Sequence, residues 1–218
     1  MTDNLVPLST SPRKASKEVR RQQLIEATID TLARRGYSAT TLADVAKTAG
    51  LSGGIVNFHF ESKEKLLVET LRALAAEYRT NWRSALAMAG KSPAERLEAI
   101  LSADFNEVVC TQRKLAAWCA FWAEAQSRPT YLDHCSANDE EYQETITNVV
   151  DEIISEGRYP YEAARLARGV EAMMEGIWLD MMTMQSPITR EEGMKTVFAC
   201  LAAFFPRHFT AEGARVPE

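Results

Sequence analysis

The sequence contains no long apolar run and few of the residues that build metal sites or disulfide frameworks. No apolar stretch reaches the roughly 18 residues that a membrane span requires, and no signal peptide opens the chain, so we expect a cytoplasmic protein without a membrane partner. The cysteines form no CxxC pair and the histidines are scattered, which argues against a metal site and favours reduced thiols. These residues are Cys110, Cys119, Cys135, Cys200, His59, His134 and His208.

The sequence also lacks the alternation of β-strands and the motifs of common enzymes. No Ser/His/Asp set, metal-ligand cluster or phosphate-binding loop is visible, so we expect neither catalytic residues nor a cofactor. The composition that remains is ordinary and globular, with 46% hydrophobic and 25% charged side chains in 218 residues. A chain of this length builds one or two domains.

Apolar residues recur at helical spacing along most of the chain and predict an all-α protein. Serine, proline and glycine residues mark the expected helix ends. The predicted helices cover about 16–35, 42–49, 52–60, 63–89, 93–109, 112–127, 129–157, 161–185 and 189–205. The predicted domains are a disordered tail (1–12), a helix-turn-helix head (13–62), a ligand-binding and dimerisation body that begins with a long helix (63–209), and a second tail (210–218).

Residues 41–60, TLADVAKTAGLSGGIVNFHF, have the pattern of a helix-turn-helix. Gly50 supplies the tight turn, while Ala46 and Val56 supply the packing between two short helices. Such a unit offers its second helix to the major groove of DNA. We therefore predict double-stranded DNA as a partner of this segment.

Charge is divided unequally between the two parts of the chain. Residues 13–66 hold ten basic and six acidic side chains, whereas residues 67–218 hold fifteen basic and twenty-three acidic ones, within a net charge of −5. A basic end on an acidic body suits phosphate contact at one place only. Arg13, Lys14 and Lys17 form a basic arm that could follow the DNA backbone or remain solvated.

The second helix of this unit carries the small and polar side chains that a DNA groove accepts. Gly53 and Gly54 allow the backbone to come close, and Asn57 can offer a bidentate amide to adenine. Phe58 could touch a thymine methyl group or fill the core, and a phosphate would offset the charge of Lys63 at its helix N-terminus. The predicted DNA-binding residues are Thr41, Ser52, Gly53, Gly54, Asn57, Phe58, His59 and Lys63.

Aromatic and acidic residues share helix faces in the body. Trp118 and Trp122 lie one turn apart, and Glu171, Glu175 and Trp178 occur at i, i+4 and i+7. Rings with carboxylates suit a quaternary ammonium ion, although an aromatic stripe also fits a core with Glu171 paired to a nearby arginine. The predicted ligand-binding residues are Phe105, Trp118, Phe121, Trp122, Glu171, Met174, Glu175 and Trp178.

The head resembles the TetR family of transcriptional regulators. The resemblance runs through RRQQLI at 20–25, GY at 36–37, TLADVA at 41–46, AGLS at 49–52 and FESKEKLL at 60–67. It implies a homodimer whose head binds operator DNA and whose body holds a small-molecule inducer. The chain departs at Asn57 and His59, where members often carry Tyr or another aromatic residue, so the base preference stays open.

The body looks like the BetI branch of that family, whose members repress genes for making glycine betaine from choline and respond to choline. The similar motifs are DFNE at 104–107, KLAAWCAFWA at 114–123 and EGIWL at 175–179. Glu175 replaces a common Asp and Ile177 a common Leu. The charge is kept and the reach of the side chain lengthens by one methylene, so a related but bulkier amine is an alternative ligand. Two alternatives remain: a regulator of efflux or catabolic genes that senses an unrelated hydrophobic compound, and an interaction protein whose head no longer reads DNA.

The last two predicted helices each carry an apolar face. Paired across a two-fold axis, the two faces would make a four-helix dimer interface. The residues expected in this interface are Leu166, Val170, Met173, Ile177, Val197, Phe198, Leu201, Phe204 and Phe205.

Overall fold

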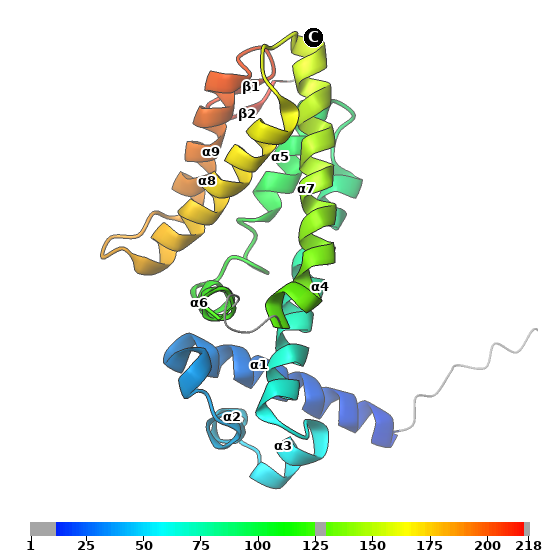
Figure 1. Ribbon diagram of the computed structural model, residues 1–218, viewed down its shortest axis with the longest axis vertical. Coiled ribbons are helices and arrows are strands. Elements are labelled where there is room, and N and C mark those ends of the chain that lie inside the picture. Colours follow the sequence, from blue (N-terminus) through cyan, green and yellow to red (C-terminus); the bar gives the residue numbers. More distant parts are fainter. Residues whose placement is uncertain (1–11, 125–129, 216–218) are drawn as a thin grey trace, which may run out of the picture.

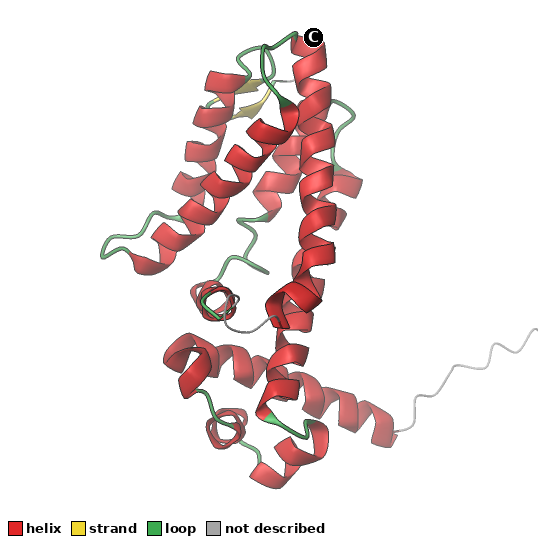
Figure 2. Ribbon diagram, in the orientation of Figure 1, coloured by secondary structure: helices red, strands yellow, loops and turns green. Residues whose placement is uncertain are grey.

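The computed structural model describes residues 12–124 and 130–215, which form nine helices and one short hairpin (Figure 1). Figure 2 shows how little of this part of the chain is strand, and the all-α prediction is confirmed. The helices are α1 (Pro12–Ala39), α2 (Leu42–Ala49), α3 (Gly53–His59), α4 (Lys63–Met88), α5 (Pro93–Ala103), α6 (Gln112–Trp122), α7 (Thr130–Gly157), α8 (Ala163–Thr183) and α9 (Arg190–Phe204). The strands are β1 (Phe209–Thr210) and β2 (Gly213–Ala214).

Helices α1, α2 and α3 form the head at one end of the molecule (Figure 1). Thr41 caps α2 by accepting a hydrogen bond from the Asp44 amide at 3.2 Å. Gly50 then ends the helix in the left-handed region (φ 65°), which a side chain would strain. Helix α3 begins three residues later, at Gly53, so the predicted tight turn between α2 and α3 is confirmed. Val56 of α3 is fully buried in the hydrophobic core of the head.

The body is built around the long helices α4 and α7, with α5, α8 and α9 packed alongside (Figure 1). Ser62 caps α4 by accepting from the Lys65 amide, and Ser92 forms a reciprocal capping box with Glu95 at the start of α5. Helix α6 lies between the two parts and contacts α1 of the head as well as α8 of the body. The head and the body therefore meet through α4 and α6.

Several predicted helix bounds differ from the observed ones. Helix α1 begins at Pro12 and is interrupted at Gly36, whose φ of 73° and ψ of 178° are not helical. Helix α5 ends at Ala103 rather than 109, because Asn106 forms a turn in which its side chain accepts from the Val108 amide. Helix α6 ends at Trp122; the predicted positions 125–127, like the tail residues 1–11, lie outside the described residues.

The expectation that no strand is present was wrong for residues 209–214. Strands β1 and β2 pair antiparallel, and the Ala214 amide donates to Glu98 of α5 at 2.8 Å. Phe209, the last residue of the predicted body, is buried against Phe205. Gly213 is also buried, so this part of the predicted tail packs on the body. Two-residue strands leave no alternation for a sequence pattern to reveal.

The predicted dimer face was also wrong. Most of its residues are buried inside a single chain, where they fill the core of the body. The fully or nearly fully buried ones are Val170, Ile177, Val197, Phe198, Leu201 and Phe205. Among the predicted interface residues, only Phe204 is clearly exposed. The others are buried because the apolar face of an amphipathic helix packs first against the core of its own chain.

Candidate functional site

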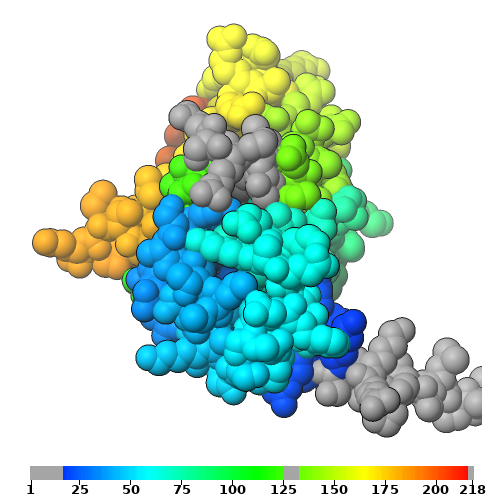
Figure 3. All heavy atoms as spheres, turned by 60° about the horizontal axis from the view of Figure 1, so that its bottom comes forward, coloured from blue at the N-terminus to red at the C-terminus, as the bar shows by residue number. Residues whose placement is uncertain are grey.

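Helix α3 lies at the end of the head (Figure 3), and four of its seven residues are exposed: Gly53, Gly54, Asn57 and Phe58. Ser52, Gly53, Gly54 and Asn57 are exposed, as the DNA-binding prediction requires. A Cβ atom added at Gly53 would meet nothing within 4 Å, so the glycine is not needed for packing within this chain. Because the two glycines carry no side chain, this surface allows the helix to approach a DNA backbone or groove closely.

Phe58 is 72% exposed, which rules out the alternative that it fills the core. Its ring lies under the Lys17 ammonium, 5.6 Å from the centroid. The neighbouring His59 is half-buried, and its buried Nδ1 has no hydrogen-bond partner among the residues that the structure describes. Burial, together with the charges of Lys17 and Arg21, lowers the pKa of His59, so its imidazole is neutral at pH 7.

Thr41 and Lys63 already have partners within the protein. The Thr41 hydroxyl donates to the Asp44 carboxylate at 2.6 Å while capping α2. The Lys63 ammonium donates to the Ser38 carbonyl at 3.0 Å and lies 5.8 Å from the Tyr37 ring centroid. Lys63 therefore ties the start of α4 to the end of α1 and retains N–H donors for a further acceptor.

The body contains a cavity of about 510 Å³ between α4, α6, α7 and α8. This volume lies within the usual range of small-molecule sites. The lining residues are Tyr78, Asp104, Trp118, Trp122, Asp139, Tyr142, Gln143, Arg168, Glu171, Met174, Glu175 and Trp178. Six of the eight predicted ligand-binding residues are among them.

Five aromatic rings surround this cavity, and we call them the aromatic cage: Tyr78, Trp118, Trp122, Tyr142 and Trp178. Tyr78 is at their centre, with its ring centroid 6.4 Å from that of Trp118, 5.6 Å from that of Tyr142 and 5.9 Å from that of Trp178. Trp118 and Trp122 are stacked 6.2 Å apart. Edge-to-face packing of this kind holds the rings in fixed positions.

Asp104 is the most deeply buried carboxyl group at the cavity, with 2% of its surface exposed. The Tyr142 hydroxyl donates to its Oδ2 at 2.8 Å, and Oδ1 has no hydrogen-bond partner among the described residues. The Trp178 indole N–H donates to the Asp104 backbone carbonyl at 3.2 Å. Burial raises the pKa of Asp104 to about 7, despite hydrogen bonds from Tyr142 and Tyr78 that lower it.

The remaining charges lie nearer to solvent. Glu171 is half-buried, and its Oε1 has no hydrogen-bond partner among the described residues; burial raises its pKa although the charge of Arg168 opposes the shift. With the Gln143 amide oxygen turned towards it, the Arg168 guanidinium donates to that oxygen at 3.0 and 3.1 Å. Glu175 is exposed at the rim. Four carboxyl groups and one guanidinium thus line the cavity, which favours a cationic ligand.

Two predicted ligand-binding residues lie elsewhere. Phe105 is buried against α9, where its ring would meet a Cβ added at Gly193 at 2.8 Å. Phe121 packs edge-on against Tyr37 of the head, with centroids 5.8 Å apart. Both face away from the cavity because residues adjacent in sequence to lining residues point to a different side of the backbone.

The sequence analysis did not identify half of the residues that line the cavity. The missed residues are Tyr78, Asp104, Asp139, Tyr142, Gln143 and Arg168. Tyr78 lies in the middle of α4, and the α7 residues follow no aromatic pattern of their own. Asp104 offered one signal, since it opens the DFNE motif at 104–107 that resembles the BetI branch.

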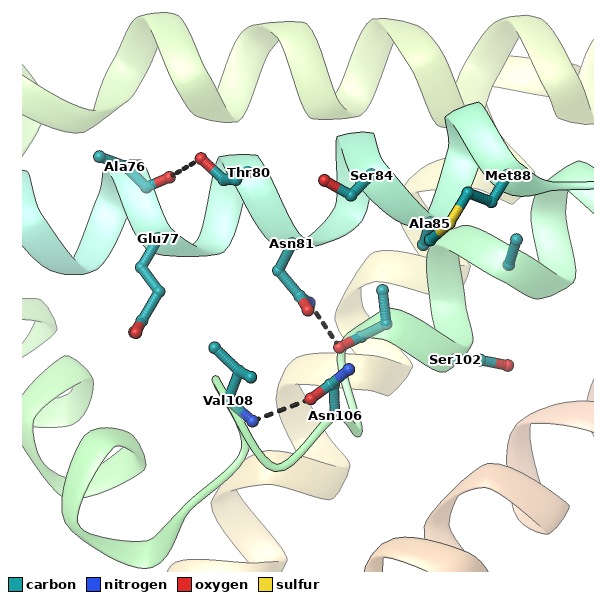
Figure 4. A pocket seen from close by; sticks show the side chains of 12 residues that line it. Ala76, Glu77, Thr80, Asn81, Ser84, Ala85, Met88, Ser102, Asn106 and Val108 are labelled. Carbon is teal, nitrogen blue, oxygen red and sulfur yellow. Dashed lines mark hydrogen bonds between the residues drawn. The ribbon is translucent and has the colours of Figure 1, made fainter. Parts of the chain in front are cut away.

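A second, more open groove of about 680 Å³ lies between α4 and α5 (Figure 4). Two of its polar side chains are engaged within the protein: Asn81 donates to the Ala103 carbonyl at 2.7 Å, and Glu77 pairs with Lys114 at 2.5 Å. The remaining lining is mainly small residues such as Ala76 and Ser84. Without aromatic walls, this groove is a poorer candidate ligand site than the cavity.

Helix α6 connects the cavity to the head. Trp118 and Trp122 face the cavity, whereas Arg113 on the same helix pairs with Glu26 at 2.6 Å and Asp30 at 3.0 Å in α1. A ligand that displaces the indoles would therefore act on a helix that is also bonded to the head.

The described residues contain no group of His, Cys, Asp or Glu side chains arranged to hold a metal ion. None of the helices in that part of the chain combines the length and apolarity that crossing a bilayer demands.

Two family profiles match the chain. Residues 24–70 match the bacterial regulatory proteins of the tetR family, and residues 93–206 match the C-terminal domain of BetI-type transcriptional repressors. Among individual proteins, the regulator BetI of Stenotrophomonas maltophilia is 34% identical over 169 residues, covering 77% of this chain and 84% of that protein. The BetI regulator of Klebsiella pneumoniae is 31% identical over 90% of this chain and 96% of its own length.

Solved structures have the same fold. A protein described as a transcriptional regulator from Pseudomonas aeruginosa superposes with a TM-score of 0.74 at 26% identity, covering 87% of this chain and 92% of that one. A regulator from Saccharomonospora viridis, solved in complex with choline, also gives a TM-score of 0.74, at 19% identity over 85% of this chain and 96% of that one.

Proposed function

The chain belongs to the tetR family of bacterial regulatory proteins and carries a BetI-type C-terminal domain, and from this premise we propose that choline or a related quaternary amine releases it from operator DNA. It is a ligand-responsive transcriptional repressor of the BetI-like kind, and its relatives are regulators of transcription rather than enzymes. The proposed targets are genes for glycine betaine synthesis or choline uptake. The observation that carries the ligand assignment is the composition of the cavity.

Five aromatic rings and four carboxyl groups line the cavity against one guanidinium. A quaternary ammonium ion has no N–H to donate, so ring faces and nearby negative charge are its main means of recognition. Each ring face contributes roughly 0.5–2 kcal/mol when the site is desolvated. The regulator from Saccharomonospora viridis that was solved with choline has this fold, which supports the same ligand class here.

Operator binding is proposed for the exposed face of α3. Asn57 would read a base edge, Gly53 and Gly54 would let the helix approach, and Phe58 would contact a thymine methyl group. Its ring contacts Lys17 and His59 but is 72% exposed, so most of it is available to a partner. The half-buried and neutral His59 would contribute at most one N–H to a phosphate.

A dimer is proposed through an exposed face of small residues on α8 and α9. This face comprises Gly169, Ala172, Gly176, Ala199 and Ala203. Each mid-helix glycine costs roughly 1 kcal/mol relative to alanine, yet a Cβ added at Gly169 or Gly176 would meet nothing within 4 Å. Close approach by the helices of a second copy accounts for this cost, and it would set the two α3 helices about 34 Å apart for successive major grooves.

Release from DNA requires only modest coupling between the two sites. A hundredfold loss of operator affinity corresponds to about 2.7 kcal/mol. The proposed route runs from Trp118 and Trp122 through α6 to its contacts with α1 of the head. A ligand that binds the two arrangements of α6 unequally would supply this energy.

The proposal is tested by calorimetric titration of the full-length protein with choline and with 3,3-dimethylbutan-1-ol, a neutral molecule of the same shape. We expect micromolar binding of choline and at least tenfold weaker binding of the alcohol. Anisotropy of a labelled operator duplex should then fall as choline is added. If a neutral apolar compound binds and releases DNA while choline does neither, the protein is a sensor of another ligand class.

A further inference from the structure

Asp104 is a buried carboxyl group at the cavity wall that has no cationic partner among the described residues. Its Oδ2 accepts from Tyr142 at 2.8 Å, and its Oδ1 has no hydrogen-bond partner in the part of the chain that the structure describes. The adjoining backbone is held too, because the Asp104 carbonyl accepts from the Trp178 indole. The carboxyl group is therefore held beside the aromatic cage and is almost entirely removed from solvent.

We propose that Asp104 is the anion by which the cavity selects a positively charged ligand, and that ligand binding expels a proton from its carboxyl group. This inference rests on the proposed function and adds to it a charge-selecting residue and a dependence on pH. As the cation enters the cavity, the O–H bond of the Asp104 carboxylic acid breaks. The electron pair stays on the carboxylate, and the proton leaves to solvent.

The physical reason is the cost of a buried, unpaired charge. A carboxylate in a poorly hydrated site is disfavoured unless a cation or several donors compensate it. Among the described residues, the hydrogen-bond donors to this carboxyl group are tyrosine hydroxyls, and the pKa of Asp104 is about 7. A quaternary ammonium in the aromatic cage would stabilise the carboxylate through space, which requires no hydrogen bond and no exposed lone pair.

The groups that face Asp104 do not compete for this role. Tyr78 of α4 and Tyr142 of α7 have pKa values well above 10, so both remain neutral donors. Burial raises the pKa of the nearby Cys110 thiol to about 11, which keeps it protonated. Arg190 of α9 is charged but pairs with Glu107 at the surface.

The other carboxylates are placed less well to select charge. Asp139 and Glu175 are exposed, where solvent screens their fields. Glu171, on α8, faces the Arg168 charge, which opposes its effect on a cation. Asp104 therefore combines the deepest burial with the least compensation.

The test is calorimetry of the full-length wild-type protein with choline chloride at pH 6, 7 and 8, in two buffers of different ionisation enthalpy. A group of pKa near 7 in the free protein predicts that affinity rises about tenfold from pH 6 to pH 8. It also predicts release of about half a proton per site at pH 7. Choline binding without proton release would overturn the inference and leave the proposed function standing, whereas failure of wild type to bind choline would end both.

Two carboxyl-to-amide variants test which carboxyl group releases the proton when choline binds. Asp104→Asn should lose the pH dependence and the proton release, and bind choline at least about thirtyfold more weakly at pH 8. Glu175→Gln, at the rim of the same cavity, should keep the proton release and should weaken choline binding less than Asp104→Asn does. Unchanged binding and proton release in Asp104→Asn, or their loss in Glu175→Gln, would contradict the assignment.

A third variant guards against a folding defect in Asp104→Asn. Tyr142→Phe removes the hydrogen bond that lowers the pKa of Asp104, so the pH at which choline affinity rises should move upward. Circular dichroism establishes that each variant is folded. An unchanged midpoint in folded Tyr142→Phe would count against the proposed role of Asp104.

Discussion

The head and the body place their proposed functional side chains in opposite ways. In the head, one short helix carries them outward, and Asn57 and Phe58 are exposed. In the body, four helices and the segment after α5 turn them inward around a cavity. A surface that reads DNA needs side chains that water also reaches, whereas a site for a cation needs rings and charge removed from water.

This difference predicts how separable function and stability are in each part. An exposed side chain of the head contributes little to the free energy of unfolding, so its loss affects binding alone. A buried side chain of the body packs the core and lines the site at once, so its loss affects both. Four predictions test this contrast, in order of decreasing effect.

The largest effect is expected for Trp178→Ala. Trp178 is 8% exposed, packs against Tyr78 and bonds the Asp104 carbonyl, so its removal should destabilise the protein by about 3–5 kcal/mol. Choline affinity should fall at least about a hundredfold. Thermal unfolding and calorimetry measure the two losses. Trp178→Phe keeps a ring and should recover most of both, and a Trp178→Ala protein of wild-type stability would contradict the buried position.

The next effect concerns pH and the stability of the ligand-free protein. The folded pKa of Asp104, about 7, lies above the ordinary 3.8, so the folded state binds more protons than the unfolded state between those pH values. Its contribution to stability therefore falls as pH rises from about 4 to 7 and is constant above 7.

Asp104→Asn should remove this trend. Relative to wild type, the variant should gain roughly 2–4 kcal/mol between pH 4 and pH 7. Urea unfolding of both proteins across this range gives the difference, in which groups with the opposite trend, such as Glu141, cancel. A difference that does not vary with pH would show that Asp104 is ionised in the empty cavity.

A smaller effect, confined to the head, is expected for Asn57→Ala. Loss of a bidentate amide contact should weaken operator binding by about 1–3 kcal/mol per head. Binding to unrelated duplexes, the melting temperature and choline affinity should stay unchanged because the side chain is exposed. Anisotropy titrations with operator and scrambled duplexes provide the comparison. An equal loss on both duplexes would assign Asn57 to the phosphate backbone instead.

The smallest effect is expected where the two parts meet. Arg113→Gln removes the ion pairs of α6 with Glu26 and Asp30, which are partly exposed and so worth about 1 kcal/mol or less. Operator affinity without ligand and choline affinity should change little. The loss of operator affinity caused by choline should shrink a few-fold, as measured by anisotropy with and without choline. Full coupling in the variant would place the transmission elsewhere, for example at Phe121 and Tyr37.

The site of the head was more predictable than that of the body for the same physical reason. Gly53, Gly54 and Asn57 were identified from neighbouring positions in one motif, and all three are exposed as predicted. For the body, helical spacing identified the α6 and α8 residues that share a face, such as Trp118 and Trp178. The same spacing misplaced Phe105 and Phe121, because periodicity gives a face of a helix but not the neighbour that it meets.

The sequence by itself determined the helices, the helix-turn-helix and the division into a basic head and an acidic body, since each depends on residues close together in the chain. Only the tertiary structure decided that Tyr78, Asp104 and Tyr142 meet at one cavity. It also decided that the apolar faces of α8 and α9 are buried in the core of their own chain, and that small residues of these helices are exposed on the surface. These outcomes depend on which helix packs against which. That choice is set by the summed burial of many side chains and leaves no local pattern in the chain.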